Sequence, residues 1–423
     1  MTLRTCIVAL NAYPAIDPEI PGPIGGIETR AWTLAQGLAR RPDCEVSFAV
    51  RHSEPLRRTE YNRVQLRLLL DRWYAAKESL ALRLRRCSRF PYIEWKHPRI
   101  SDLATLAVAG WSRWKRRHED LLAPMAFYQQ IPSDVFLTFG VQGNSARVIS
   151  SAHATGRPAV LFLSSDGDLD ERYLSGNPFV SKYHDHADVC RWIIDHADHI
   201  LCQTEWQQKQ AKRFGRDATL LRNPIDLEWW DQHRHRDNIE TITHGLQRYV
   251  LWVGRAEDFH KCPAVAVEIA RRTPEVDYLM ILNRRDDVVE RQVRQSAPPN
   301  LHIIERVSFP EMPAVMQRAA ALLNTSRQEG FPNTFLQAAA SGVPVASLNV
   351  ESEMLANSKA GFCGQGNLET LTDYVRRCWK GRPEPFDAPS ARSWVETHHD
   401  LTAQSVALEQ ILRQVVEKHR CGQ

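Results

Sequence analysis

The sequence lacks any apolar stretch long enough to cross a membrane. A spanning helix needs roughly 20 consecutive apolar residues, and apolar runs such as residues 319–323 are far shorter. The first 14 residues also lack the small-residue cleavage site of a secretory signal peptide, so we expect a β-strand there. Together with 43% hydrophobic and 25% charged residues, these absences favour a soluble globular protein.

Paired cysteines and a strong net charge are missing as well. The nine cysteines are scattered without a Cys-x-x-Cys pair, which fits reduced thiols better than a disulfide framework. The net charge is only +4, so charge alone does not indicate a nucleic-acid partner. The histidine pairs 184/186 and 398/399 have no carboxylate or cysteine at a matching spacing, so we expect no metal site.

Short apolar runs alternate with helical patterns in both halves of the chain. At 423 residues there is room for two domains, each with its own core. This alternation predicts two Rossmann-like halves with parallel sheets. Strands are expected at residues 5–10, 46–50, 134–139, 159–163, 199–202 and 219–222, and then at 249–255, 278–282, 301–304, 319–323 and 343–347.

The stretch from residue 324 to residue 348 predicts a strand, a turn, a helix and another strand. Gly330 and Pro332 interrupt the chain, and residues 333–334 (Asn-Thr) are suited to cap the helix that follows. Glu329 stands just before this turn. An acidic residue and a glycine turn at a helix N-terminus, on the carboxyl edge of a parallel sheet, lie where such folds bind ligands.

A second glycine turn, Gly25-Gly26, follows the first strand and opens a helix. Such a turn exposes backbone N–H groups at the positive end of the helix. A tight turn without function is the simpler interpretation of a Gly-Gly pair taken alone. Its position in the first strand-to-helix loop of a Rossmann-like half favours a loop that faces a ligand.

Residues 51–132 mix arginines with tryptophans and leucines, most densely over 63–117. Basic residues interleaved with Trp and Leu on helices suggest a surface that faces anionic lipid or a lipid-linked acceptor. An ordinary helical insertion with solvated arginines is the alternative interpretation. No nucleic-acid-binding module is recognisable, so nucleic acid is not expected as a partner.

The loop after the strand at 159–163 contains Asp166-Gly167-Asp168, and three interpretations remain open. In the first, the two carboxylates hold a metal, because paired carboxylates suit a hard cation. The loop can equally be a capping turn without function. In the third interpretation it is an active-site loop, with Asp166 in a polar role.

Three motifs of this sequence resemble retaining GT-B glycosyltransferases of family 4. They are residues 329–334 (Glu-Gly-Phe-Pro-Asn-Thr), Gly254-Arg255 with Lys261, and residues 223–226 (Asn-Pro-Ile-Asp). The resemblance implies an α/β protein of the GT-B fold, with two Rossmann-like domains facing a central cleft and a helical basic insertion in the N-terminal domain. The expected ranges are an acceptor domain at 1–230 with the insertion at about 51–132, a linker at 231–247, a donor domain at 248–390, and a helical segment at 391–423 that crosses back to the first domain.

The resemblance also implies roles for individual residues. Glu329 is expected beside the anomeric centre of the donor sugar, with Asp166 as a second catalytic group. Three positions depart from the family pattern: Gln337 replaces a glutamate, no histidine follows the strand ending at Leu163, and residues 283–285 (Asn-Arg-Arg) replace a glycine-rich turn. The expected donor-binding residues are Arg255, Lys261, Val307, Gly330, Phe331, Pro332, Asn333, Thr334 and Gln337, and the expected phosphate or acceptor loop is Gly25 and Gly26.

By this resemblance the chain is expected to be a hexosyltransferase that retains the anomeric configuration. It would move a sugar from a nucleotide-diphosphate sugar to a glycan or lipid-linked acceptor, without a metal or other cofactor, in cell-envelope or exopolysaccharide synthesis. It would work in the cytoplasm, at the inner face of the membrane if residues 63–117 contact anionic lipid. The alternative is a non-catalytic GT-B protein that binds sugar nucleotides or assembles with partners.

Overall fold

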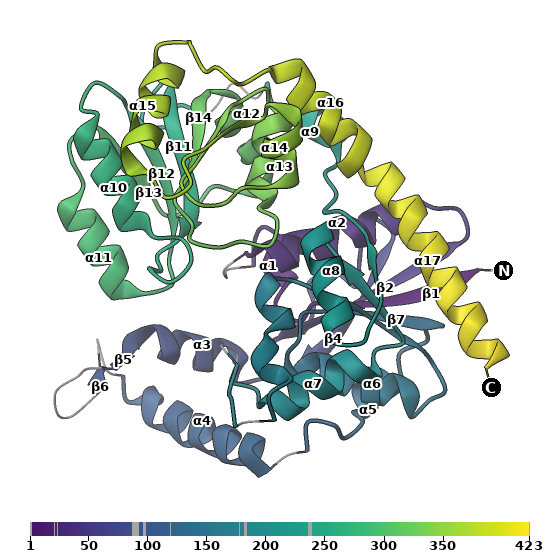
Figure 1. Cartoon of the computed structure of the whole chain (residues 1–423). Coiled ribbons are helices and arrows are strands. Elements are labelled where there is room, and N and C mark those ends of the chain that lie inside the picture. Colours follow the sequence, from purple (N-terminus) through teal and green to yellow (C-terminus); the bar gives the residue numbers. More distant parts are fainter. Residues whose placement is uncertain are drawn as a thin grey trace. The chain divides into compact units, whose positions relative to one another are not determined.

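The computed structural model describes residues 2–20, 22, 24–86, 93–95, 99–118, 120–176, 178–181, 184–235 and 239–422. The chain divides into two compact units (Figure 1). Unit 1 comprises residues 1–221 and 405–423, and unit 2 comprises residues 222–404. Each unit is built on one mostly or wholly parallel sheet with helices on both faces, as expected of Rossmann-like halves.

The sheet of unit 1 has the order β10-β9-β8-β7-β1-β2-β4-β3. All neighbours pair in parallel except β3, which runs antiparallel to β4 at the edge. The strands are β1 Leu3–Val8, β2 Cys44–His52, β3 Glu60–Tyr61, β4 Val64–Leu70, β7 Val135–Phe139, β8 Ala159–Phe162, β9 His199–Cys202 and β10 Ala218–Leu220. The helices are α1 Tyr13–Ile16, α2 Gly26–Ala39, α3 Tyr74–Arg83, α4 Ser101–His118, α5 Ala126–Gln129, α6 Gly143–His153, η1 Asp166–Leu169, η2 Glu171–Tyr173, α7 Ala187–His196 and α8 Glu205–Arg213.

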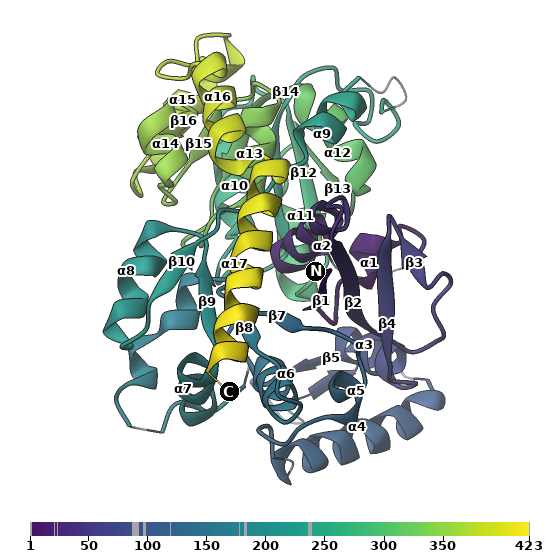
Figure 2. The same cartoon turned by 90° about the vertical axis from the view of Figure 1, so that its right-hand side faces the viewer.

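Two apolar layers hold unit 1 together. One layer lies between the sheet and α1, α2 and the long final helix α17 (Leu401–Cys421). The other lies between the opposite face of the sheet and α5 to α8. The apolar face of α17 includes Leu408 and Leu412, both fully buried, and Figure 2 shows this helix in yellow along the strands of unit 1. A strong amphipathic pattern at the end of the chain thus returns residues 405–422 to the first unit.

The sheet of unit 2 is wholly parallel, in the order β13-β12-β11-β14-β15-β16. Its strands are β11 Tyr249–Arg255, β12 Tyr278–Asn283, β13 Leu301–Ile304, β14 Ala319–Asn324, β15 Val345–Ser347 and β16 Gly361–Cys363. Helices α10, α11 and α15 pack on one face, and α9, α12, α13, α14 and α16 pack on the other. The helices are α9 Leu227–His233, α10 Pro263–Arg272, α11 Asp287–Ser296, η3 Phe309–Glu311, α12 Met312–Gln317, α13 Asn333–Ala340, α14 Glu353–Ser358, α15 Leu368–Trp379 and α16 Ala388–His399.

The boundary between the units falls earlier than the position expected from sequence. The sequence places it after residue 230, whereas the contacts place it between Leu221 and Arg222. Trp230 is fully buried in the core of unit 2, and its indole Nε1–H donates to Ser341 Oγ at 2.9 Å. Ile239, inside the expected linker, is buried in the same core. The polar residues around Trp230 and Ile239 predicted a linker, but these two apolar side chains pack the segment onto unit 2.

The segment at 51–132 is helical only in part. Residues 64–70, interpreted as helical from sequence, form strand β4, which pairs in parallel with β2. Val64 and Leu66 alternate toward the core and are buried there, a spacing of two that suits a strand. The helical part consists of α3 and α4, which contact each other and are joined through a small hairpin of β5 (Leu84–Arg86) and β6 (Ile93–Trp95) (Figure 1).

Two further expectations concern membranes and thiols. Among the described residues, none of the helices combines the length and apolar character needed to cross a bilayer. The cysteines within the described ranges form no disulfide; Cys87 lies outside those ranges.

Candidate functional site

The candidate site of unit 2 is built on two neighbouring parallel strands, β11 and β14. The loops that follow their carboxyl ends are bonded to each other. The Thr325 hydroxyl lies 2.8 Å from the carbonyl oxygen of Lys261, to which it can donate, and accepts from Trp252 Nε1 at 2.9 Å. The Arg327 amide donates to the carbonyl of His260 at 2.9 Å. This bonding brings the residues after each strand to one edge of the sheet, where ligands bind in open parallel sheets.

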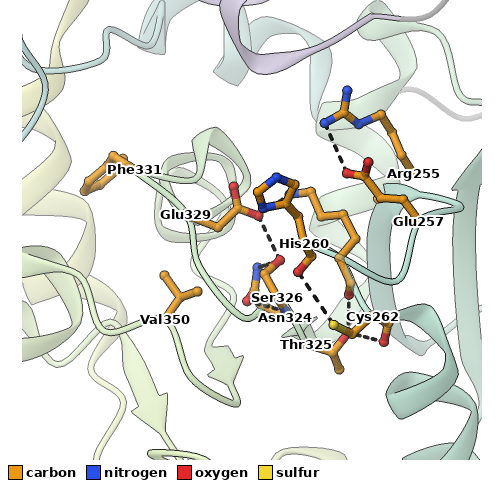
Figure 3. Close-up of polar contacts among 12 residues, drawn as sticks. Arg255, Glu257, His260, Cys262, Asn324, Thr325, Ser326, Glu329, Phe331 and Val350 are labelled. Carbon is orange, nitrogen blue, oxygen red and sulfur yellow. Dashed lines mark hydrogen bonds and ion pairs between the residues drawn. The ribbon is translucent and has the colours of Figure 1, made fainter. Parts of the chain in front are cut away.

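At this edge of the sheet, Glu329 contacts residues from both loops. Its Oε1 atom pairs with Lys261 Nζ and accepts a hydrogen bond from Ser326 Oγ at 2.8 Å (Figure 3). The side chains of Glu329 and Lys261 are 19% and 20% exposed, so solvent or a ligand can reach both. A charge-assisted pair of this kind fixes the orientation of the carboxylate through its Oε1 atom.

Local chain geometry positions Lys261 for this contact. Cys262 adopts the left-handed region at φ +48°, and Pro263 starts α10 immediately after it. Proline fixes its own φ for the first helical turn. Lys261 therefore lies just before the helix start, separated from it by the left-handed residue Cys262.

Arg255 lies at the end of β11 but does not join this pair. Its guanidinium contacts the carboxylate of Glu257 at 3.1 Å, and its side chain is 41% exposed. Figure 3 shows the Arg255–Glu257 pair away from Glu329. The structure therefore brings Lys261 and Glu329 together and leaves the arginine at a second point of the same strand end.

Helix α13 begins directly after the motif, without the side-chain cap expected from sequence. Pro332 occupies the N-cap position and provides no capping hydrogen bond, whereas Asn333 and Thr334 were expected to cap. Both lie in the first turn and are half-buried, as is Gln337 one turn later. Spacings of three and four residues put these side chains on one helix face, so the exposed face of α13 gathers the predicted donor-binding residues, and Gly330 precedes it.

Two residues that the sequence analysis did not assign to the site hold the motif in place. Asn223 donates from Nδ2 to the carbonyl of Phe331 at 3.2 Å and to Asn333 Oδ1 at 2.9 Å. The His399 ring packs against the Phe331 ring with centroids 4.9 Å apart, and its Nδ1 lies 2.7 Å from the Asn223 carbonyl. In the sequence, these contacts of Asn223 and His399 were indicated only by the Asn-Pro-Ile-Asp motif, to which Asn223 belongs.

Burial explains the electrostatic state of His399. The residue is fully buried, and this desolvation lowers its pKa to about 3. Because a carbonyl only accepts, Nδ1 carries the hydrogen and the ring is the neutral tautomer. Among the described residues no cluster of three or more His, Cys, Asp or Glu side chains is arranged to hold a metal ion.

The remaining unit 2 positions lie at the neighbouring strand ends. Val307 follows β13 and packs partly against the core. Asn283 ends β12, and its Nδ2 donates to the Gly254 carbonyl at 3.3 Å. The turn that departs from the family pattern is thus tied to the strand that leads into Arg255.

In unit 1, Gly25 and Gly26 begin helix α2 as expected. Gly25 is the N-cap in an extended conformation, with φ −112° and ψ 177°. The carboxylate of Glu28 lies over this turn, since a Cβ added to Gly25 would stand 2.5 Å from Glu28 Oε2. The helix start therefore already faces one negative charge, which opposes a phosphate at the same point.

The Asp166–Asp168 loop follows β8 and divides its two carboxylates between different contacts. Asp168 is buried and forms a capping box with Ser165, and it accepts from the Ser164 amide at 2.6 Å. Asp166 is half-buried, and its Oδ1 accepts from Gln207 Nε2 at 3.0 Å. The capping interpretation therefore describes Asp168, and Asp166 is the more exposed of the two carboxylates.

Beneath this loop lies a buried arginine that the sequence analysis did not single out. Arg30 of α2 places its guanidinium 4.3 Å from the centroid of the Phe162 ring and donates to the Leu163 carbonyl at 3.1 Å. Desolvation lowers its pKa to about 9. Arg30 thereby ties the start of α2 to the end of β8.

Comparison with known proteins gives a family match for unit 2. Residues 239–380 match the family model of glycosyl transferases group 1. No curated protein matches the chain.

Solved structures match over nearly the whole chain. Sucrose-phosphate synthase from Thermosynechococcus elongatus has a TM-score of 0.67 at 13% identity, covering 98% of this chain and 100% of that one. HepE from Anabaena, in complex with UDP, has a TM-score of 0.60 at 12% identity, covering 98% and 100%. A glycosyltransferase from Rickettsia africae has a TM-score of 0.62 at 12% identity, covering 98% and 99%.

At these identities the structural likeness shows the fold alone. The fold is GT-B, with two Rossmann-like units, and this prediction is confirmed. Together with the family match over residues 239–380, it supports a glycosyltransferase.

Proposed function

We propose that the chain is a retaining glycosyltransferase of family 4 that moves a hexose from a nucleotide-diphosphate sugar to a glycan or lipid-linked acceptor. One observation carries the proposal. The carboxylate of Glu329 is held by Lys261 and Ser326 at the carboxyl edge of β14, immediately before the uncapped start of α13. A carboxylate, a cation and a helix start whose N-cap residue makes no side-chain hydrogen bond suit a sugar joined to a diphosphate.

The diphosphate is the part of the donor that needs positive charge. Lys261 and Arg255 supply two cations from the loop and strand end of β11, and the amides at the start of α13 supply hydrogen-bond donors. Both cations are paired with carboxylates in the free chain. Donor binding therefore exchanges part of these ion pairs for contacts with phosphate oxygens. The UDP bound by Anabaena HepE supports a nucleotide as the leaving group.

Glu329 acts at the sugar. The bond between the anomeric carbon and the phosphate oxygen breaks with its electron pair going to the diphosphate, so positive charge develops on the sugar. A carboxylate next to that carbon stabilises this charge. The acceptor hydroxyl attacks from the face that the phosphate leaves, and its proton passes to the departing phosphate oxygen. This front-side course retains the anomeric configuration and needs no covalent enzyme intermediate.

Gln337 addresses the ribose of the nucleotide. Its amide oxygen accepts one hydrogen bond from a ribose hydroxyl, but without the charge of a glutamate. The substitution costs on the order of 1 kcal/mol of binding. Donor affinity is thus expected in the micromolar to millimolar range rather than below it.

Metal independence, acceptor class and location belong to the same proposal. The cations of Lys261 and Arg255 take the charge-neutralising role that Mg²⁺ has in metal-dependent transferases, so activity is expected to persist in EDTA. Asp166, at the end of β8, takes a polar role toward the acceptor. We propose that the transfer reaction takes place in the cytoplasm and serves cell-envelope or exopolysaccharide synthesis.

The experiment is calorimetric titration of UDP, GDP and ADP, and of their sugar conjugates, into the wild-type chain. Hydrolysis of the bound sugar nucleotide is then measured for wild type, Glu329→Ala and the control Glu351→Ala, an exposed acid beyond β15. One nucleotide sugar should bind and be slowly hydrolysed, with hydrolysis lost only in Glu329→Ala. Absence of binding by every nucleotide would overturn the site assignment.

A non-catalytic GT-B protein is the second candidate, and Gln337 is the observation that favours it. A sensor or assembly protein needs affinity for the sugar nucleotide but no group acting at the anomeric carbon. Binding without hydrolysis or transfer, unchanged in Glu329→Ala, would support this candidate over the enzyme.

A further inference from the structure

The strand order of each sheet changes direction at one place, and open parallel sheets bind ligands at the carboxyl ends of the strands there. In unit 2 the chain runs from β11 to β12 and β13, and later to β14, β15 and β16 on the other side. The change of direction lies between β11 and β14, where Lys261 and Glu329 meet. In unit 1 the chain runs from β1 to β2, β4 and β3, and later to β7, β8, β9 and β10. The corresponding place in unit 1 is therefore the carboxyl end of β1, which β2 and β7 flank.

Arg51 is held at this place by uncharged groups. It is the second-last residue of β2, and its amide donates to the carbonyl of Leu10, just after β1, at 2.8 Å. Its Nη2 donates to Asn11 Oδ1 at 2.9 Å, and its guanidinium carbon lies 4.4 Å from the centroid of the Tyr74 ring. An amide oxygen and an aromatic face orient a guanidinium without cancelling its charge.

Cations that lie close to Arg51 in the sequence are arranged differently. Arg57 pairs with Glu19, and Lys77 of α3 pairs with Asp71 at 2.7 Å. Within the described ranges, no carboxylate lies at ion-pair distance from Arg51. In the same ranges its Nε is buried without a hydrogen-bond partner. Part of the guanidinium is thus shielded from water, which strengthens its attraction for an anion.

Two carboxylates also act on this cluster. Glu28 and Glu78 add to the effect of burial in raising the pKa of Tyr74. Glu28 also lies over the Gly25 turn at the start of α2, so that turn opposes an anion. Carboxylates near an arginine suit a ligand that carries hydroxyl groups as well as one anionic group, because ionised carboxylates accept from hydroxyls.

We propose that Arg51, together with Asn11 and Tyr74, binds an anionic group of the acceptor, either a phosphate or a sugar carboxylate. The inference rests on the proposed function only in assigning this ligand to the acceptor. Arg51 is half-buried, and its planar guanidinium presents N–H groups in a fork that matches the oxygens of phosphate and carboxylate. This site narrows the acceptor to an acidic glycan or a phosphate-bearing lipid-linked sugar, and disfavours a neutral glycan.

The test is binding of glucose 6-phosphate, glucuronate and glucose to the full chain, measured by ligand-observed NMR titration. Wild type should bind one of the two anionic sugars about ten-fold more tightly than glucose, and the preferred one identifies phosphate or carboxylate. Arg51→Gln should weaken that binding about ten-fold, and Arg51→Lys, which keeps the charge but not the fork, by less. Asn11→Asp keeps Arg51 but places a carboxylate against its guanidinium. It should therefore weaken binding as much as Arg51→Gln, and its exposed position leaves the core unchanged.

The matched control is Arg57→Gln, which removes a nearby cation that is already paired with Glu19 and should bind the sugars as wild type does. Three outcomes would overturn the proposal. The first is absence of binding by both anionic sugars, or equal binding of glucose. The second is binding that Arg51→Gln and Asn11→Asp both retain. The third is binding that is lost in Lys261→Gln but kept in Arg51→Gln, which would place the anion in unit 2.

Separate titrations of the wild-type chain distinguish this proposal from the proposed function. Nucleotide binding without anion-selective sugar binding would refute the Arg51 site and leave the donor site standing. Anion-selective sugar binding that depends on Arg51, without binding of any nucleotide, would refute the donor site and leave the Arg51 site standing.

Discussion

The buried histidine behind the motif makes stability depend on pH in a predictable way. Desolvation lowers the pKa of His399 from 6.5 to about 3. The folded chain therefore keeps this ring neutral, while the unfolded chain binds a proton below pH 6.5. Because the unfolded state binds more protons, the stabilisation is complete above pH 6.5 and is lost as the pH falls toward 3.

The size of the effect follows from the two pKa values. At pH 5, about 1.5 pH units below the unfolded value, the loss is about 2 kcal/mol relative to pH 8. The assay is urea unfolding followed by fluorescence at both pH values. His399→Asn keeps a donor for the Asn223 carbonyl but has no titrating group, so it should remove this part of the pH dependence.

The controls isolate this one histidine. Desolvation also lowers the pKa of His199 in unit 1, which gives the same sign, so the quantity of interest is the difference between variant and wild type. His398→Asn, at the half-buried neighbouring position, should behave as wild type. If His399→Asn loses as much stability between pH 8 and pH 5 as wild type does, His399 is not the source of the pH dependence and the prediction is wrong.

Three further changes test other contacts. Ser326→Ala removes one hydrogen bond to the motif carboxylate and should lower donor kcat/KM about 3- to 10-fold, measured by steady-state transfer or hydrolysis. Gln337→Glu should tighten nucleotide binding about 5-fold in calorimetry by restoring a charge-assisted bond, whereas Gln328→Glu, exposed in the loop before α13, should not. Trp230→Phe breaks the buried bond to Ser341 and should lower the urea midpoint of unit 2, a loss of about 1–2 kcal/mol that a Ser341→Ala background would reduce.

Strand positions were largely predictable because most strands are buried on both faces. Continuous apolar runs of four to seven residues in parallel sheets give a direct signal, and the ranges at 249–255, 301–304 and 199–202 agree with β11, β13 and β9. The short strands β3, β5, β6 and β16 were not expected, and residues 64–70 were expected to be helical. Their leucines and arginines suit a helix as well as a strand, and only pairing with β2 selects the strand.

The motif itself was visible in sequence, but its partners were not. Glu329, Lys261 and the helix that follows the motif could be identified from residue types and spacing. The Lys261–Glu329 pair joins residues 68 positions apart, and the Asn223–His399 contact joins residues 176 positions apart. No local pattern encodes such distances.

The sequence by itself determined the alternation of strands and helices, the motif residues and the apolar face of the final helix, because these depend on neighbours within a few positions. The tertiary structure alone decided which charges meet. It paired Arg255 with Glu257 and Lys261 with Glu329, and it buried His399 against Phe331. Burial and ion pairing depend on which strand ends share a sheet edge, and only the folded chain fixes that.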